Sequence, residues 1–313
     1  MKPDFSILIP AFNEEENVDD LFTAMDAYLA TQPFSAEVLF IDDGSRDRTV
    51  ELLKSHSFAH AKKTIIKLSR NFGAFSASRA GILHAAADNC MIYSMDMPEP
   101  VTVIGTFYEK LMEGNDIVVS VRKNYKMSLA SKVFTKLQKK FVSRDFPENG
   151  IASAAIDGKV KRELNRNIEG DTPLLFQIYN MGFQKCFIES QIQERQHGQS
   201  KWTLGKKMRL FIDTFVSFSN LPIRFISGMG FLFAFIGILY ALVIIVIKLF
   251  HLMELATGWP ALISLLLIGF GITNISLGVL SEYLVRTLDA ARNRPAFIID
   301  EILDENGTSV TLE

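Results

Sequence analysis

The sequence is poor in cysteine and has almost no net charge. Its 313 residues include 2 cysteines, Cys90 and Cys186, and neither belongs to a CxxC pair, which argues against a disulfide framework and a zinc site. We expect both to be small apolar residues of buried strands in a reducing compartment. The formal net charge of -2 at pH 7 lacks the strongly basic character of a nucleic-acid-binding protein.

Two common nucleotide-binding loops and an export signal are also absent. The chain contains no GxGxxG and no GKS/T loop, which argues against a dinucleotide-dependent dehydrogenase and a P-loop NTPase. No signal peptide precedes the first apolar segment, since Met1 to Asp4 lead directly into it. We therefore expect the N-terminal domain to remain in the compartment where it is synthesised.

Long apolar runs, by contrast, are present near the C-terminal end. Phe225 to Ile247 and Trp259 to Ser281 are uncharged, and each contains about 23 residues. At about 1.5 Å per residue, a helix of that length crosses a hydrocarbon core of roughly 30 Å. The pattern predicts a hairpin of two transmembrane helices. The alternative, a buried hairpin in a soluble protein, is disfavoured because both runs exceed the usual length of a core helix.

Basic residues gather at the two outer ends of the hairpin, before the first run and after the second. They are Lys201, Lys206, Lys207, Arg209 and Arg224 before the first run, and Arg286, Arg292 and Arg294 after the second. The loop between the runs carries a single lysine, Lys248. The excess of positive charge predicts that both chain ends lie in the cytoplasm and that the loop lies outside.

The N-terminal part alternates short apolar segments with helical patterns. The expected strands are Phe5 to Ile9, Glu37 to Ile41, Lys63 to Leu68, Cys90 to Ser94 and Asp116 to Val121. This alternation predicts an α/β fold with a doubly wound, mostly parallel sheet. Sheets of this kind bind ligands at the carboxyl ends of their strands, where the polar motifs of this chain occur.

Two basic amphipathic stretches complete the organisation. They cover residues 122–141 and 203–220, and their apolar residues recur at helical spacing. Beside a bilayer, such helices lie in the interface, although they can also pack as ordinary surface helices on the domain. We expect a nucleotide-binding domain over 1–200, an interfacial helix over 201–224, the two spans over 225–285 and a cytoplasmic tail over 286–313.

Polar motifs follow the first, second and fourth expected strands. Pro10 to Glu15 and Asp42 to Thr49 follow the first two, and together they favour a nucleotide site, although each alone is a common capping or turn pattern. Asp96 follows the fourth strand and is a candidate ligand for Mg²⁺. Arg195 and Lys201, close to the membrane segment, are suited to phosphate oxygens.

These motifs occur together in one known family. The segments PAFNEEEN, IDDGSRDRT, SRNFGAFSASRAG, RQHGQSKW, SFSNLPIR and SEYLVRTLDAARNRP extend over most of the chain. In combination they resemble membrane-anchored family 2 glycosyltransferases of the polyisoprenyl-phosphate type, which include bactoprenol glucosyltransferases and dolichol-phosphate mannose synthase. The resemblance implies a Rossmann-like GT-A fold and an inverting transfer of sugar from a nucleotide-sugar, expected to be a UDP-sugar, to undecaprenyl phosphate.

The resemblance also implies roles for individual residues. The nucleoside of the donor would be bound by Pro10, Ala11, Asn13, Glu14 and Asp43. Asp96 would hold a divalent cation, Mg²⁺ or Mn²⁺, on the diphosphate. The donor and lipid phosphates would be held by Arg122, Arg195, Ser200 and Lys201, and the catalytic set would be Asp96, Arg195 and Lys201. The expected location is the cytoplasmic face of the bacterial inner membrane, in cell-envelope glycan synthesis.

The chain departs from the family pattern at two places. Where the family has Asp-x-Asp-Leu-Gln-Asp-Pro, this chain has Ser94 and Pro98 in place of the first Asp and the Gln. Where the family has Gly-Asp-Phe-Arg, it has Ile151 to Ala154, so the Asp offered as a catalytic base is missing. A lipid phosphate has a second pKa of roughly 6 and is largely a dianion at neutral pH, so it needs positioning more than deprotonation.

Alternatives remain open at the level of function and assembly. The same departures are compatible with a catalytically silent membrane protein that binds nucleotide-sugars or organises partner enzymes. A processive polysaccharide synthase is disfavoured, because the Gln-x-x-Arg-Trp motif and further spans are absent. Glycines in the two runs permit close helix packing, which serves either the hairpin itself or a homo-oligomer.

Overall fold

The computed structural model describes most of the N-terminal domain and one long C-terminal helix. The described residues are 2–123, 146, 147, 150–167, 172–191, 258–291, 295–305, 307–310 and the single positions 232, 235, 239, 246, 249 and 250. The chain divides into two compact units. Unit 1 comprises Met1–Thr214 and Pro295–Glu313, and unit 2 comprises Phe215–Arg294.

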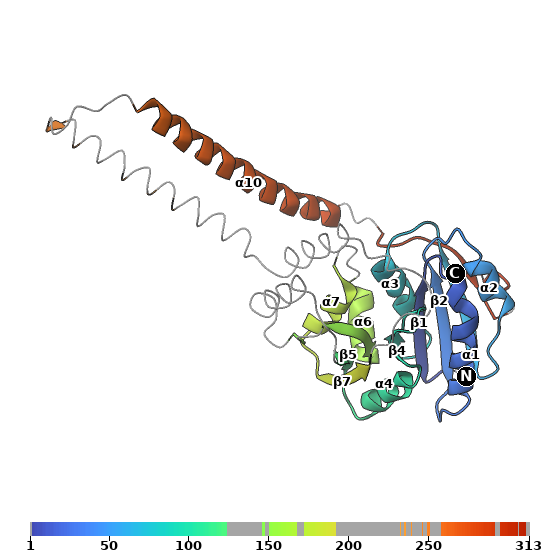
Figure 1. Ribbon diagram of the computed structural model, residues 1–313. Helices are drawn as coiled ribbons and strands as arrows, with labels where there is room; N and C mark the ends of the chain where they lie inside the picture. Colours follow the sequence, from blue (N-terminus) through green and yellow to red (C-terminus); the bar gives the residue numbers. More distant parts are fainter. Residues whose placement is uncertain are drawn as a thin grey trace. The chain divides into compact units, whose positions relative to one another are not determined.

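The described strands of unit 1 form one eight-stranded sheet in the order β7-β5-β6-β4-β1-β2-β3-β8 (Figure 1). The strands are β1 (Phe5–Ala11), β2 (Ala36–Asp42), β3 (Ala61–Leu68), β4 (Asn89–Ile92), β5 (Ile117–Lys123), β6 (Ile151–Ile156), β7 (Lys185–Gln191) and β8 (Ile299–Leu303). Strands β4, β1, β2 and β3 pair in parallel, as do β5 and β7, whereas β6 and β8 pair antiparallel with their neighbours. The expected α/β, mostly parallel sheet is confirmed.

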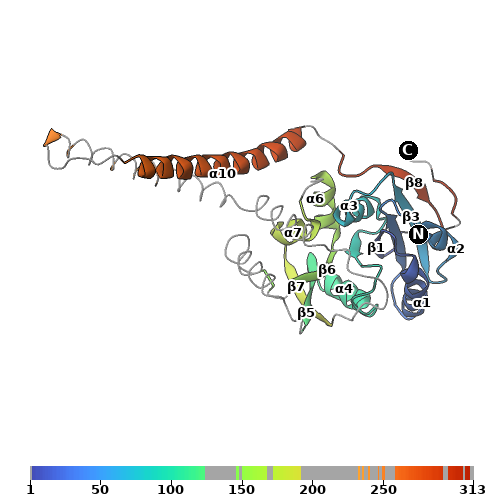
Figure 2. The ribbon, with the colours of Figure 1, turned by 45° about the horizontal axis from the view of Figure 1, so that its top comes forward.

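Helices cover both faces of this sheet. They are α1 (Val18–Leu29), α2 (Thr49–Ser55), α3 (Ala74–His84), α4 (Val103–Met112), α6 (Gly158–Arg166) and α7 (Leu174–Asn180), and a short 3₁₀ turn, η1 (Glu15–Asn17), precedes α1. The buried side chains of α1, α2 and α4 belong to one apolar cluster, and those of α3, α6 and α7 belong to a second. Figure 2 shows α1 and α4 on one side of the sheet and α3 and α6 on the other. The sheet is therefore doubly wound.

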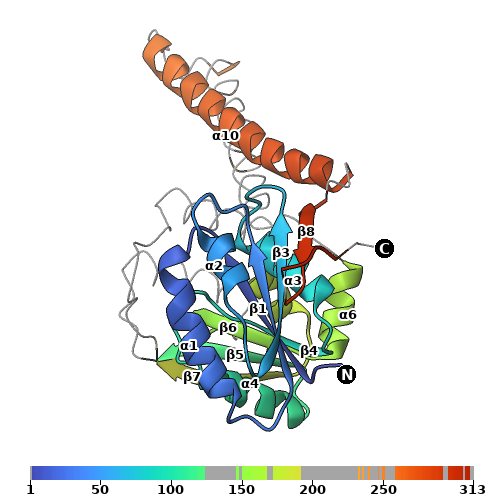
Figure 3. The same ribbon diagram turned by 90° about the vertical axis from the view of Figure 1, so that its right-hand side faces the viewer.

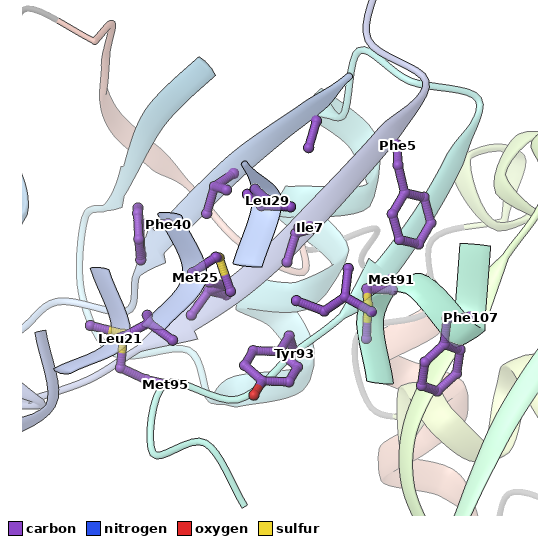
Figure 4. Close-up of a cluster of buried hydrophobic side chains, with 14 of the residues drawn as sticks. Phe5, Ile7, Leu21, Met25, Leu29, Phe40, Met91, Tyr93, Met95 and Phe107 are labelled. Atoms are coloured by element: carbon purple, nitrogen blue, oxygen red, sulfur yellow. The ribbon is translucent and has the colours of Figure 1, made fainter. Parts of the chain in front are cut away.

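The alternation of side chains along β1 explains why its sequence is mostly apolar, with Ser6 as the polar exception. Phe5, Ile7 and Ile9 point into the first cluster, whereas Leu8 points into the second. Successive strand residues face opposite sides, and both sides of this strand are covered by helices. Figure 4 shows Phe5 and Ile7 in the first cluster with Met25 of α1.

Strands β6 and β8 were not predicted from the sequence, and β7 was indicated only by the apolar stretch around Cys186. Strand β6 lies between β4 and β5, and Ala154 is paired with both Ile92 and Val119. Strand β8 adds to the edge of the sheet beside β3 in the segment expected to be a tail (Figure 3). Lys67 of β3 donates a hydrogen bond to Glu301 at 3.3 Å across this pair.

The described part of unit 2 is dominated by helix α10 (Trp259–Ala291), which contains 33 residues. Many of its large apolar side chains are exposed, among them Leu266, Phe270 and Ile275, at 61%, 71% and 64%. Among its described residues, the structure contains no helix that is both long and apolar enough to cross a membrane. The transmembrane hairpin thus stays a prediction. The amphipathic stretches expected over 122–141 and 203–220 lie almost wholly outside the described residues.

Candidate active site

The first two polar motifs form one interlocked structure at the carboxyl ends of β1 and β2. The backbone N–H of Asn13 donates to the Ser45 hydroxyl at 2.9 Å, and the N–H of Glu14 donates to the Thr49 hydroxyl at 2.8 Å. In return, the Asn13 side-chain oxygen accepts from the N–H of Arg46 at 2.8 Å. Asn13 has φ of 52°, a left-handed conformation that Asn adopts more readily than most residues. These bonds hold the two loops together as a preformed surface.

The predicted donor-binding residues of the first loop are therefore brought together as expected. Pro10 and Ala11 end β1, and Ala11 is paired with Asp42 of β2. The Glu14 carboxylate accepts a hydrogen bond from the Asn17 side chain at 2.6 Å at the start of α1. This places Glu14 at the rim of the platform, which is the name we give to residues 10–15 and 42–49.

Asp43 connects the platform to a third loop, between β3 and α3. Its two carboxylate oxygens accept hydrogen bonds from the N–H groups of Phe72 and Gly73, at 2.7 and 2.9 Å. The side chain is buried, and this burial raises the pKa of Asp43 to about 6 against the opposing effect of the two N–H bonds. The structure thus gives the predicted ligand Asp43 a role in tying three loops together.

The neighbours of Asp43 explain the tight fit of this turn. Burial is also the main cause that raises the pKa of Asp42, whose carboxylate accepts from the N–H of Ser45 at 3.2 Å. Gly44 has φ of 75°, and a Cβ there would lie 2.8 Å from the Arg70 carbonyl carbon. Glycine is required at this position both by the backbone conformation and by the close approach of the third loop.

Asp96 lies in the loop between β4 and α4, at the same edge of the sheet. The Ser94 hydroxyl donates to its Oδ1 at 2.5 Å, and Met97 next to it has φ of 41°. Among the described residues, no group of three or more His, Cys, Asp and Glu side chains is placed to hold a metal ion. One carboxylate together with substrate phosphates and waters nevertheless suits Mg²⁺. Asp96 therefore fits a cation that arrives with a diphosphate, but not a cation held by several carboxylates.

A second acidic residue in this loop, Glu99, was missed from the sequence. It is 0% exposed, and its Oε2 accepts a hydrogen bond from the Ser153 hydroxyl of β6. Within the part of the chain that the structure describes, its other oxygen, Oε1, has no hydrogen-bond partner. The sequence did contain a signal: Glu99 follows Asp96 by three residues, so one short loop carries two carboxyl groups.

The predicted phosphate-binding residues are only partly described. Arg122 lies at the carboxyl end of β5, where it is paired with Ser190 of β7. Strands β4 and β5 run in the same direction, since each is antiparallel to β6, so Arg122 and Asp96 follow strand ends at one edge. Arg195, Ser200 and Lys201 lie outside the described residues.

Comparison with known proteins identifies the kind of enzyme. Residues 6–162 match the family described as "Glycosyl transferase family 2". The chain belongs to this family. The platform, Asp96 and Glu99 all fall within the matched residues, so the candidate active site of this family 2 glycosyltransferase is the carboxyl edge of its sheet.

Several relatives resemble this glycosyltransferase over nearly its whole length. An uncharacterized glycosyltransferase of Bacillus subtilis is 31% identical over 95% of this chain and 93% of its own. An undecaprenyl-phosphate 4-deoxy-4-formamido-L-arabinose transferase of Klebsiella pneumoniae is 28% identical over 97% of this chain and 95% of its own. A prophage-derived bactoprenol glucosyl transferase of Shigella flexneri is 29% identical over 94% and 96%.

Solved structures share the fold at lower sequence identity. Glucosyl-3-phosphoglycerate synthase from Mycobacterium tuberculosis, solved with Mn²⁺, UDP and glucosyl-3-phosphoglycerate, superposes with a TM-score of 0.50 at 13% identity. The match covers 69% of this chain and 80% of that one. It confirms the Rossmann-like α/β fold of the glycosyltransferase.

Proposed function

We propose that this glycosyltransferase moves a sugar from a nucleotide-sugar, expected to be a UDP-sugar, to a polyprenyl phosphate such as undecaprenyl phosphate. The observation that carries the proposal is the similarity to the Klebsiella and Shigella transferases over at least 94% of this chain. That similarity extends beyond the family-matched residues 6–162 into unit 2, so it includes the segment expected to meet a lipid acceptor.

The platform supplies the binding surface for the nucleoside. Its hydrogen bonds within and between the loops set the backbone before any ligand arrives, which lowers the entropy lost on binding. Carboxylate and amide side chains at the ends of adjacent strands accept hydrogen bonds from ribose hydroxyls and from a base N–H. We assign these contacts to Asn13 and Glu14, whereas the buried Asp43 would contribute by holding the three loops in place.

The diphosphate of the donor would extend from the platform toward Asp96. A divalent cation, Mg²⁺ or Mn²⁺, would be held there by Asp96 and the diphosphate, and when bound it supplies positive charge that stabilises the departing nucleotide. The solved mycobacterial enzyme of the same fold contains Mn²⁺ with UDP. Ser94 donates to the carboxylate of Asp96 and so orients it.

The transfer itself is a single displacement with inversion. An oxygen of the lipid phosphate forms a bond to the anomeric carbon, and the bond from that carbon to the nucleotide diphosphate breaks, with its electron pair leaving on the diphosphate. Because a phosphate dianion carries no proton to remove, the protein has to position it and stabilise charge. Arg122, Arg195, Ser200 and Lys201 are the residues that we assign to the phosphates.

We place the reaction at the cytoplasmic face of the bacterial inner membrane. The exposed apolar side chains of α10 support contact with lipid, because a soluble surface rarely carries so many large apolar groups together. Three polar side chains of α10 have hydrogen bonds within the helix: Thr273, Asn274 and Ser276 each donate to the carbonyl four residues earlier. Such bonds lower the cost of placing these side chains away from water.

Transfer assays with the full-length protein in detergent test the proposal. Radiolabelled nucleotide-sugars are incubated with undecaprenyl phosphate and Mg²⁺ or Mn²⁺, and lipid-linked product is extracted. We expect product only when lipid acceptor is present, and an Asp96→Asn variant should lose about 10²–10³-fold in kcat. Asp88→Asn, at an exposed carboxylate paired with Lys2, serves as the matched control. Turnover without polyprenyl phosphate would contradict the proposed acceptor.

A second candidate function is a silent binder of nucleotide-sugars. It is favoured by Ser94, Pro98, Ala152 and Ala154, which replace polar positions of the resembling family. Calorimetric binding of a donor, together with no transfer from any donor of a broad panel, would select this candidate over the first.

A further inference from the structure

Among the described residues, unit 1 buries two glutamates that each accept a hydrogen bond from a serine of a neighbouring strand. Glu37 in β2 accepts from Ser6 of β1, and Glu99 after β4 accepts from Ser153 of β6. The two pairs lie at opposite ends of the sheet, because Glu37 is near the start of its strand whereas Glu99 follows the carboxyl end of β4. They form a natural comparison between two buried carboxyl groups.

In the pair at the amino ends of the strands, Glu37 accepts three hydrogen bonds from the protein. In addition to the Ser6 hydroxyl, Oε1 of Glu37 accepts from the N–H groups of Ala86 at 2.5 Å and Ala87 at 3.3 Å. These residues follow α3, so Glu37 anchors the return of the chain from that helix to β4. Its role is structural.

The pair at the carboxyl ends has an acceptor to spare. Oε1 of Glu99 is buried and accepts no hydrogen bond from any residue that the structure describes. Leaving a buried polar atom unpaired costs about 1–3 kcal/mol, and native proteins contain few such atoms. Glu37 accepts three hydrogen bonds and ties the chain to the sheet, whereas the Glu99 carboxylate accepts one, so a comparable structural role does not explain the burial of Glu99.

The position of Glu99 places this acceptor beside the donor site. Tyr93 donates to the Glu99 carbonyl at 2.5 Å, and the pKa of Tyr93 is raised by burial and then by the charges of Glu99 and Asp96, so both carboxyl groups lie near it. On the other side, the N–H of Ser153 donates to the Ser120 hydroxyl of β5 at 2.9 Å. Glu99 thus connects the loop that it shares with Asp96 to the strands that lead to Arg122.

We propose that Oε1 of Glu99 accepts a hydrogen bond from a hydroxyl group of the transferred sugar and thereby selects the donor. The inference rests on the proposed function and adds a specificity-determining residue to it. Ser153 holds Oε2 and orients the free oxygen. Since Glu99 is 0% exposed, the loop from Ser94 to Pro100 must shift as the donor enters.

The test compares binding of nucleotide-sugar with binding of free nucleotide. Full-length protein in detergent is titrated calorimetrically with UDP-glucose, UDP-N-acetylglucosamine and GDP-mannose, and with UDP and GDP. In Glu99→Gln, an amide N–H replaces one acceptor oxygen. We expect affinity for the tightest nucleotide-sugar to fall about 10–100-fold and affinity for the free nucleotide to change less than about threefold. Glu37→Gln, the matched control, should lower the melting temperature and leave both affinities unchanged.

Deoxy analogues of the same nucleotide-sugar identify the hydroxyl group. One analogue should bind wild type about as weakly as the parent sugar binds Glu99→Gln, and it should show no further loss with that variant. Equal weakening of nucleotide and nucleotide-sugar by Glu99→Gln would overturn the inference, as would unchanged affinity for both. If the variant does not fold, deoxy analogues that all bind wild type within threefold of the parent overturn it.

The inference and the proposed function fail in different ways. Wild type that binds no nucleotide-sugar more tightly than the free nucleotide contradicts the role of Glu99, whatever the acceptor. Wild type that shows the expected selectivity through Glu99, but transfers sugar to no polyprenyl phosphate, contradicts the acceptor and retains the sugar contact.

Discussion

The buried carboxyl group of Asp43 makes a specific prediction about stability and pH. Burial is the largest cause that raises its pKa from 3.8 to about 6. One pKa unit corresponds to about 1.4 kcal/mol, so ionising Asp43 in the folded protein costs on the order of 3 kcal/mol more than in the unfolded chain. The side chain is 3% exposed, so screening by solvent does not reduce this figure greatly.

The direction of the effect follows from proton binding. Between about pH 4 and pH 6 the folded state holds a proton on Asp43 that the unfolded chain has released, so the free energy of unfolding falls as pH rises through this interval. The asparagine of Asp43→Asn cannot ionise, so the free energy of unfolding of this variant does not decrease with pH for this reason. The stability of the variant relative to wild type should therefore rise by up to about 3 kcal/mol from pH 4 to pH 7, or about 6–12 °C in melting temperature for a domain of this size.

Thermal unfolding followed by circular dichroism between pH 4 and pH 7.5 measures this difference. The slope with pH is diagnostic, because the hydrogen bond lost in the variant changes its stability by a constant amount. Asp88→Asn is the control: the Asp88 carboxylate is bonded by Lys2, which lowers its pKa, so this variant should show no such rise. A pH-independent difference for Asp43→Asn, within about 1 kcal/mol, would refute the reasoning.

Three further predictions concern the folding of unit 1. Gly44→Ala should lower the melting temperature by more than Gly114→Ala. Both glycines have positive φ, which costs an alanine about 1–2 kcal/mol, but of the two only Gly44 has backbone atoms within 3 Å of a new Cβ. Lys63→Met should lower the free energy of unfolding in urea by about 1–3 kcal/mol, because the buried ammonium donates to the carbonyls of Leu53 and His56. Burial lowers the pKa of Lys63, so wild type should gain stability as pH rises toward 10, whereas the variant should not. Leu303→Ala should cost about 2–5 kcal/mol because this residue of β8 is buried in the first apolar cluster, whereas Val310→Ala, at an exposed position, should change little.

The sequence predicted the parallel part of the sheet well, for a clear physical reason. Strands such as β1 and β2 are buried on both faces, so most of their residues are apolar, and the strands end abruptly at polar turns. The same turns located the platform, because carboxyl ends of parallel strands meet at one edge. Asp43 shows the limit of this reasoning: a motif places an acidic residue at the edge but does not tell whether ligand or backbone will use its oxygens.

The strands that escaped prediction carry weaker signals. Strand β6 consists mainly of small residues, and β8 includes Asp300 and Glu301 beside its apolar positions. Their pairing partners are distant in sequence, so no local pattern indicates the order of the sheet. Glu99 was missed for a related reason, since its interest comes from Ser153, a contact that exists only when β6 is placed beside β4.

Strand β8 makes unit 2 an insertion in unit 1, because the chain leaves unit 1 after Thr214 and returns to it at Pro295. During synthesis, the edge of β3 therefore waits uncovered until the ribosome has released nearly the entire polypeptide. An exposed strand edge invites pairing with other chains, so the nascent protein is most vulnerable to aggregation while the residues between Thr214 and β8 are being synthesised. Ribosome-bound chains that stop before residue 299 should accordingly recruit chaperones more strongly than complete ones.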